Sequence, residues 1–246
     1  MPGLKDSTGF RYMRDTCFSR QNIARRPEPH ISPAETYKQY PAAEKISLAV
    51  PADRGTNSLQ SLLQGRRSVR RYSRAPAGIE DLAFLLWAAQ GVTARAGSHL
   101  LRTAPSAGAL YPIETYLAVE NITGLAPGLF HFDVRNFGLE RLTSGPPGQL
   151  VARAALNQGF IGKGAAVFIW SAVYRRNMSK YGERGLRYIL MDAGHICQNL
   201  LLAAAALNLA ACPVAAFYDE ELNEILDLNE EEESVVYLAV VGGRQP

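Results

Sequence analysis

The first residues in this chain that could do chemistry are a run of arginines around a serine. Arg66, Arg67 and Arg70 flank Ser68, and two more arginines follow before residue 75. A guanidinium binds a phosphate monoester through two parallel hydrogen bonds, and a nearby serine hydroxyl adds a neutral donor without bulk. The run therefore predicts a phosphate-binding segment, and a solvated basic surface is the alternative interpretation.

A second segment has residues small enough for a ligand to lie against the backbone. It contains Pro105, Ser106, Ala107 and Gly108, and is followed by Tyr-Pro at positions 111 and 112. Small residues between turn formers leave backbone N–H and C=O groups accessible to the edge of a flat ring. The two segments together predict a ligand that carries both a phosphate and a planar ring.

The remaining polar residues give weaker signals. Asp192 and His195 lie three positions apart in a predicted helix, so their side chains share one face and suit either a proton relay or an internal polar network. His30, His99 and His131 have no cysteine or carboxylate at the spacing of metal ligands. No metal site is predicted.

Helices and strands that would position these residues follow from the hydrophobic periodicity. Apolar residues at three- and four-residue intervals predict helices over residues 59–65, 79–90 and 185–209. β-branched and aromatic runs predict strands over residues 114–120, 128–133, 139–142, 165–174 and 235–241. The mixed order, without regular βαβ units, predicts an α+β fold with helices packed around a mostly antiparallel central sheet.

The chain is expected to form an N-terminal arm, residues 1–57, and one domain, residues 58–246. The arm is interrupted by prolines, which disfavour long regular elements. The helix over residues 185–209 is apolar almost all round in its later turns, so it must be covered on every side. Burial against a second copy of the chain would do this, and a homodimer is expected.

Composition excludes several classes of protein. The 246 residues are 47% hydrophobic and carry a net charge of only +3, which suits a folded domain rather than a nucleic-acid-binding protein. Three widely spaced cysteines indicate a reducing compartment. No signal peptide is visible, and the longest apolar stretch is far shorter than the roughly 20 residues that span a bilayer. A cytoplasmic protein without membrane contact is expected.

Five motifs in register resemble one known family. They are RRSVRRYS, RTAPSAGALYPIETY, GLAPGLFHFD, the stretch over residues 179–217, and VVYLAVVGGR. The resemblance covers residues 58–244. The combination resembles the nitroreductase-like flavoprotein superfamily, and within it the SagB-type dehydrogenases, which include thiazoline and oxazoline oxidases. The resemblance implies FMN as cofactor, a homodimer with a long interface helix, and partner enzymes in a biosynthetic complex.

The resemblance also implies a role for each site residue. Arg66 and Ser68 would contact the flavin phosphate or ribityl chain, Arg70 would approach the N1 edge of the ring, and Arg67 would belong to the same cofactor-binding segment. The turn at Pro105, Ser106, Ala107 and Gly108 would reach the flavin across the subunit interface. The backbone of Pro213, Val214 and Ala215 would face the ring, and Gly243 with Arg244 would close the phosphate site.

Lys180 and Tyr181 match a lysine–tyrosine pair that is implicated in proton removal in azoline-oxidising relatives. Lysine and tyrosine ordinarily keep their protons at neutral pH, so an acid–base role requires an environment that shifts one pKa. A lysine reaching into solvent beside a half-buried tyrosine is the structural alternative.

The expected function is two-electron dehydrogenation of a small or peptide-borne substrate, with an azoline ring as one candidate. An NAD(P)H-dependent reductase of nitro compounds or quinones is the alternative within the same fold. A flavin-binding partner subunit without turnover is the alternative from another class.

Overall fold

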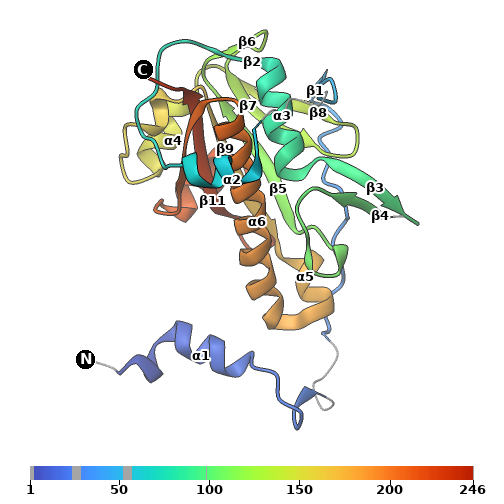
Figure 1. The fold of residues 1–246 in the computed structure, drawn as a ribbon. Coiled ribbons are helices and arrows are strands. Elements are labelled where there is room, and N and C mark those ends of the chain that lie inside the picture. The colour runs from blue at the N-terminus through green and yellow to red at the C-terminus, as the bar shows by residue number, and fades with distance from the viewer. Residues whose placement is uncertain (1–2, 24–28, 52–56, 98, 246) are drawn as a thin grey trace.

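A seven-stranded antiparallel sheet forms the centre of the protein (Figure 1). The computed structural model describes residues 3–23, 29–51, 57–97 and 99–245. The strand order is β1-β8-β7-β5-β9-β11-β10. The strands are β1 (Glu44–Ser47), β5 (Ile113–Val119), β7 (Gly128–Asp133), β8 (Gly138–Ser144), β9 (Ala166–Val173), β10 (Leu209–Val214) and β11 (Glu233–Gly243). All six neighbouring pairs are antiparallel, so the predicted α+β class is confirmed.

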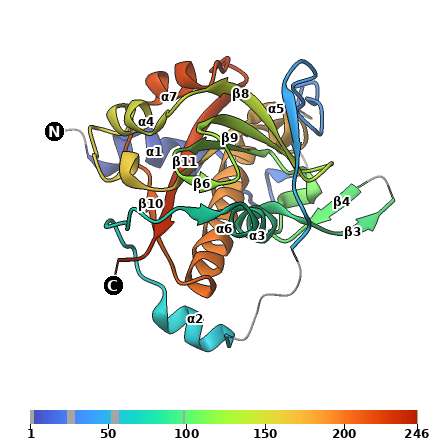
Figure 2. The same ribbon diagram turned by 90° about the horizontal axis from the view of Figure 1, so that it is seen from above.

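Helices cover both faces of the sheet (Figure 2). On one face lie α3 (Ile79–Gln90) and α6 (Gly185–Ala206), and on the other lie α4 (Gly148–Ala154) and α7 (Asp219–Ile225). Side chains of a strand point alternately to the two faces. Accordingly Phe168 and Trp170 of β9 join the core beneath α3 and α6, whereas Val167 and Ile169 join the core beneath α4 and α7.

Smaller elements surround this centre. The helices are α1 (Thr8–Asp15), α2 (Leu59–Gly65) and α5 (Tyr174–Tyr181). The short strands are β2 (Ala77–Gly78), β3 (Val92–Ala96), β4 (His99–Arg102) and β6 (Ile122–Thr123). Single 3-10 turns occupy η1 (Leu4–Asp6), η3 (Ala107–Ala109), η4 (Ile161–Lys163) and η5 (Gly182–Arg184).

The predicted helices and strands are confirmed, with corrections at their ends. The long helix ends at Ala206, three residues before the predicted end, because Asn208 adopts a left-handed conformation (φ 54°) and the chain turns into β10. That edge strand was not predicted. Within the predicted arm, β1 pairs with β8 and so adds the opposite edge strand to the central sheet.

α6 is buried on one side and exposed on the other. Its inner face packs against the sheet and α3, while Leu190 and Met191 are 61% and 57% exposed. The stretch Tyr174–Ala206, which contains α5 and α6, would pass as a membrane span by length and composition alone. Half of its apolar window is buried within the protein.

A chain of buried charges crosses one part of the sheet. His131 lies between two carboxylates, with Nδ1 2.7 Å from Glu140 and Nε2 3.1 Å from Glu114. Glu114 also pairs with Arg176 at 2.6 Å, and Glu140 pairs with Lys45. Burial alone would lower the pKa of His131, but its two carboxylate partners raise that pKa to about 9. The imidazole therefore stays protonated at neutral pH.

Glu233 belongs to a second buried group that the sequence did not reveal. It ends an acidic run whose preceding members, Glu230, Glu231 and Glu232, are exposed, yet it is only 6% exposed. Lys38 donates to it at 2.6 Å, and the hydroxyls of Tyr116 and Ser171 donate to its other oxygen. Glu233 therefore ties residue 38, in the N-terminal part of the chain, to the centre of the sheet.

Candidate functional site

The arginine run lies along the free edge of β10. After α2 the chain becomes extended, and Ser68 forms a parallel bridge with Ala211 while Tyr72 forms an antiparallel bridge with Arg244. Because β10 is the last strand of the sheet, its outer edge has unpaired backbone groups that this segment satisfies. Residues predicted from opposite ends of the sequence thus meet at one edge of the sheet.

Three arginines at this edge have no counter-charge among the described residues. Arg66 is half-buried, and Arg70 and Arg244 are exposed. None of them forms an ion pair with any residue that the structure describes, although Arg70 lies 5.8 Å from the ring centre of Phe160. Arg67 is used differently, because its guanidinium donates to the carbonyls of Gln64 and Arg66 at the end of α2. The unpaired cations suit an anionic ligand.

The residues beside these arginines contribute backbone rather than side-chain chemistry. Pro213 and Val214 are the last residues of β10, and Ala215 follows in an exposed position. A Cβ atom at Gly243 would lie 2.2 Å from the Ser73 hydroxyl oxygen, so a larger residue there would require the Ser73 side chain to move. We call the group of Arg66, Ser68, Arg70, Pro213, Val214, Ala215, Gly243 and Arg244 the arginine half-site.

The remaining predicted residues form a second group around Gly108. Gly108 has a φ of 66°, and a Cβ atom there would lie 2.7 Å from the Tyr181 hydroxyl and 3.0 Å from Lys180 Nζ. The side chains of Lys180 and Tyr181, at the end of α5, therefore face the small-residue turn directly. We call Pro105, Ser106, Ala107, Gly108, Lys180 and Tyr181 the turn half-site.

Asp192 contacts the small-residue turn from the inner face of α6. It is 4% exposed, and its contacts are with the Ser106 side chain and the Ala107 backbone. Burial raises its pKa, with these hydrogen bonds acting in the opposite direction. The sequence paired Asp192 with His195, but His195 is exposed, so the main contacts of Asp192 are with the turn instead.

Arg176 is a supporting residue that sequence reasoning missed. It is 4% exposed, and its guanidinium donates to the Tyr111 carbonyl at 3.1 Å and pairs with Glu114. It thereby connects the end of the small-residue turn to the buried charges of the sheet. Nothing in the sequence around an arginine of a short polar helix indicates this role.

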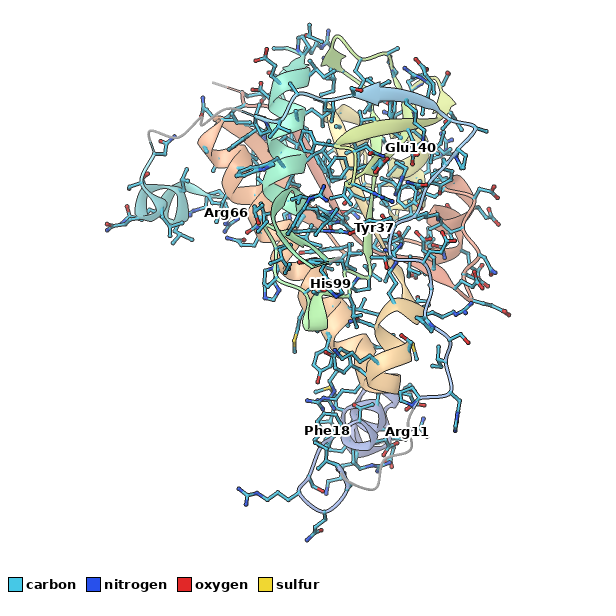
Figure 3. The ribbon with its side chains drawn as sticks, turned by 90° about the vertical axis from the view of Figure 1, so that its right-hand side faces the viewer. Arg11, Phe18, Tyr37, Arg66, His99 and Glu140 are labelled. Carbon is cyan, nitrogen blue, oxygen red and sulfur yellow. The ribbon has the colours of Figure 1, made fainter. Side chains whose placement is uncertain are left out.

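The Ser68 end of the arginine half-site and the turn half-site lie at opposite ends of the sheet, and Val214 aligns with Tyr116 between them. Strand register aligns Ala211, beside the arginine half-site, with Val119 at the end of β5. The turn half-site precedes Ile113 at the start of β5. Successive strand residues rise about 3.3 Å, so β5 alone separates the two levels by roughly 20 Å. Figure 3 shows Arg66 at the upper part of the molecule, far from the end where α5 turns into α6.

No group of three or more histidine, cysteine or carboxylate side chains that could hold a metal ion occurs among the described residues. The candidate chemistry of both half-sites therefore depends on arginine, lysine, tyrosine and backbone groups.

Comparison with known proteins identifies the family. The model of the "Nitroreductase family" matches residues 63–243. The chain is 40% identical over 172 residues to the nitroreductase-family protein MJ1384 of Methanocaldococcus jannaschii, covering 70% of this chain and 85% of the relative. It is 30% identical over 150 residues to the trifolitoxin-processing protein TfxB of Rhizobium leguminosarum bv. trifolii, covering 59% of this chain and 40% of TfxB.

Solved structures share the fold. A nitroreductase-like protein of Anabaena variabilis superposes with a TM-score of 0.77 and 26% identity, covering all of this chain and 49% of that one. The Escherichia coli microcin synthetase McbBCD complex gives a TM-score of 0.63 at 22% identity, covering 78% and 75%. A Desulfovibrio desulfuricans protein solved with FMN gives a TM-score of 0.53 at 18% identity, covering 78% of this chain and 92% of that one.

The order of the motifs, the antiparallel sheet with its long helix, and the family match over residues 63–243 agree. The chain belongs to the nitroreductase family of oxidoreductases.

Proposed function

We propose that this protein is an FMN-dependent dehydrogenase of the SagB type, in which two copies of the chain complete each flavin site. The observation that carries the proposal is the separation of the two half-sites. The arginine half-site holds the phosphate-binding groups, whereas the turn half-site holds the small-residue turn with Lys180 and Tyr181. Within a single chain, the Ser68 end of the arginine half-site lies roughly 20 Å along the sheet from the level of the turn half-site, and Val214, level with Tyr116, lies between them.

A two-fold dimer through α6 would bring unlike half-sites together. The exposed face of α6 carries Leu190 and Met191, and Gly194 on the same face leaves open space where a Cβ would be. The exposed face also carries His195 and Gln198, and the glycine at position 194 suits close packing against the same helix of a second copy. In an antiparallel arrangement of these helices, the beginning of one would lie near the end of the other.

The donors of the arginine half-site fit a flavin mononucleotide. Arg66 and Arg244 would bind the phosphate with Ser68, and the exposed backbone after Val214 would face the ring, since Ala215 offers no polar side chain. Arg70 would place a positive charge beside the N1 edge, where it stabilises the negative charge of the reduced ring. When bound, FMN would supply a two-electron acceptor at its N5 atom.

Lys180 and Tyr181 would handle the proton. Removing a hydride from a carbon next to a heteroatom requires loss of a proton from a neighbouring position, and a positioned base supplies about 10² to 10⁴ in rate. These two side chains are the titratable groups that face Gly108 at the turn. The substrate class that fits this chemistry is a small or peptide-borne azoline, with biosynthetic partner enzymes in the cytoplasm supplying the ring.

A direct test uses the visible spectrum and a pair of variants. The purified protein should be yellow with flavin absorption bands. Lys180→Ala and Tyr181→Phe should keep bound flavin and its reduction by dithionite, but lose about 10² to 10⁴ in the rate of thiazoline oxidation. Parental rates in both variants would remove the proton-transfer role.

Reduction of nitro compounds by NAD(P)H is the second candidate, favoured by the 40% identity to MJ1384. In that reaction the substrate needs no base in the protein, so Lys180→Ala should leave NADPH-driven flavin bleaching unchanged. Rapid bleaching by NADPH, together with no oxidation of thiazolines, would favour the reductase.

A further inference from the structure

The N-terminal arm is fixed against the beginning of α6 by two arginines. Arg184 donates to the Thr16 carbonyl at 2.7 Å, and Arg187 donates to the Thr16 hydroxyl at 2.9 Å and to the Met13 carbonyl. These carbonyls end α1, where backbone acceptors lack intrahelical partners and carry partial negative charge. Thr16 is only 1% exposed. The end of α1 therefore has a defined seat on the domain.

Aromatic residues of the arm strengthen this seat. The Arg184 guanidinium lies 4.3 Å from the ring centre of Phe18, and the Tyr12 hydroxyl donates to the Glu183 carbonyl at 3.1 Å. Figure 3 shows Phe18 on the arm at the lower end of the molecule, below the helices of the domain. The segment that carries Phe18 thus lies next to the corner between α5 and α6.

A cavity of about 700 Å³ lies between the arm and this corner. Its volume falls within the roughly 300 to 1,000 Å³ typical of small-molecule sites. The arm and the domain both contribute to its walls. The lining residues are Asp15, Thr16, Phe18, Asn22, Ile23, Pro29 and His30 from the arm, and Lys180, Tyr181, Gly182 and Glu183 from the domain. Lys180 and Tyr181 also face Gly108, so the cavity adjoins the turn half-site.

The walls of the cavity indicate what it would bind. Phe18 and Ile23 are 42% and 54% exposed, and with Pro29 they form an apolar lining at the outer side. Asp15 in the same lining is already paired with Arg14 at 2.8 Å. Exposed apolar side chains that line a concave surface favour an apolar group of a ligand.

We propose that the N-terminal arm is the outer wall of the substrate pocket, and that Phe18 and Ile23 select substrates with an apolar substituent beside the reacting ring. The inference rests on the proposed function for the position of the reacting ring at Lys180 and Tyr181. It assigns to the arm a specificity role that the domain alone does not supply.

Two unreactive probes separate this inference from the reaction itself. The aromatic compounds 2-phenylthiazole-4-carboxamide and 2-methylthiazole-4-carboxamide differ only in the apolar substituent. Calorimetric titration of the flavin-loaded full chain should give a dissociation constant roughly tenfold or more lower for the phenyl compound, because more apolar surface is buried.

Variants of the arm test the lining. Phe18→Ala and Ile23→Ala should each reduce the preference for the phenyl compound by about threefold or more, and leave affinity for the methyl compound unchanged. Leu4→Ala is the matched control, since Leu4 is an exposed apolar residue of the same arm that does not line the cavity. Flavin content should be the same in all three variants.

The possible results divide clearly. The pocket is supported if the protein prefers the phenyl compound, if Phe18→Ala and Ile23→Ala reduce this preference, and if Leu4→Ala keeps it. The same result without any oxidation of thiazolines would refute only the proposed reaction. Equal affinity for the two probes, or no binding of either, overturns the pocket. Removing residues 1–23 gives a further test. If this dissociates a dimer and leaves the preference for the phenyl compound unchanged, the arm is a dimer contact, and the proposed pocket is overturned.

Discussion

The charges around His131 pair with opposite charges inside the protein, whereas the arginines at the edge of β10 do not pair within its described parts. Glu114, His131 and Arg176 are each less than 5% exposed, and each is bonded to an opposite charge. Arg66, Arg70 and Arg244 lie at the surface and form no ion pair within the described parts of the chain. The first group completes its electrostatic interactions within the fold, whereas the second leaves them for a ligand. Substitutions should therefore affect stability in the first group and flavin binding in the second.

The largest effect is expected at Glu114. Glu114→Gln would leave His131 and Arg176 buried with one fewer counter-charge, and losing one partner of a buried pair costs about 3 to 5 kcal/mol of unfolding free energy. Urea denaturation of the flavin-free protein would measure it. A loss below about 1 kcal/mol would show that the buried network contributes little.

The pH dependence of stability tests the same network. The folded-state pKa of His131 is about 9 and the ordinary value is 6.5, so the folded protein holds the proton more tightly. Protonated His131 contributes its full share to the free energy of unfolding below about pH 6.5, and this share is lost as pH rises to about 9. The loss is about 3 kcal/mol, at about 1.4 kcal/mol per pH unit. His131→Gln should flatten the unfolding free energy over this range.

Smaller effects, confined to ligand binding, are expected for the arginines at the edge of β10. Arg66→Ala or Arg244→Ala should remove a charge-assisted contact worth about 1.5 to 3 kcal/mol and weaken FMN binding roughly 10- to 150-fold. The unfolding free energy of the flavin-free protein should not change. Arg95→Ala, an exposed arginine of β3, is the control, and a similar loss of FMN affinity there would contradict a specific phosphate site.

The smallest effect is expected at an exposed ion pair. Arg141 and Glu44 are 2.7 Å apart, but the Glu44 side chain is 63% exposed. Solvent-exposed pairs contribute at most about 1 kcal/mol, so Glu44→Gln should leave the urea midpoint nearly unchanged. A loss comparable to that of Glu114→Gln would mean that burial does not distinguish the two regions.

The sequence predicted the elements whose signals are local. β9 is buried on both faces, so its continuous Val, Ile, Phe and Trp run was recognisable, and the leucine spacing of α2 was equally clear. β10 was missed because its short Ala-Ala-Cys-Pro-Val run contains a proline, which an edge strand tolerates.

Features that depend on remote partners could not be predicted. Glu233 has the same sequence context as its solvated acidic neighbours, and only Lys38, Tyr116 and Ser171 make its burial favourable. The motifs likewise indicated the members of a flavin site but not the levels of the sheet at which they lie. Those levels arise from the register of β5, β9, β11 and β10, which no single motif encodes.

The central claim is that each flavin site takes the arginine half-site from one chain and the turn half-site from another. A heterodimer tests it, made by coexpressing two differently tagged chains. One carries Arg66→Ala with Arg244→Ala, and the other carries Gly108→Leu, which places a side chain where a Cβ already meets the Tyr181 hydroxyl at 2.7 Å.

Neither variant should bind FMN tightly as a homodimer. In the heterodimer, one site would combine the two intact half-sites and the other would combine the two altered ones. The measurement is the FMN content of the purified heterodimer. The account predicts one FMN per heterodimer, and a heterodimer without bound FMN would contradict it.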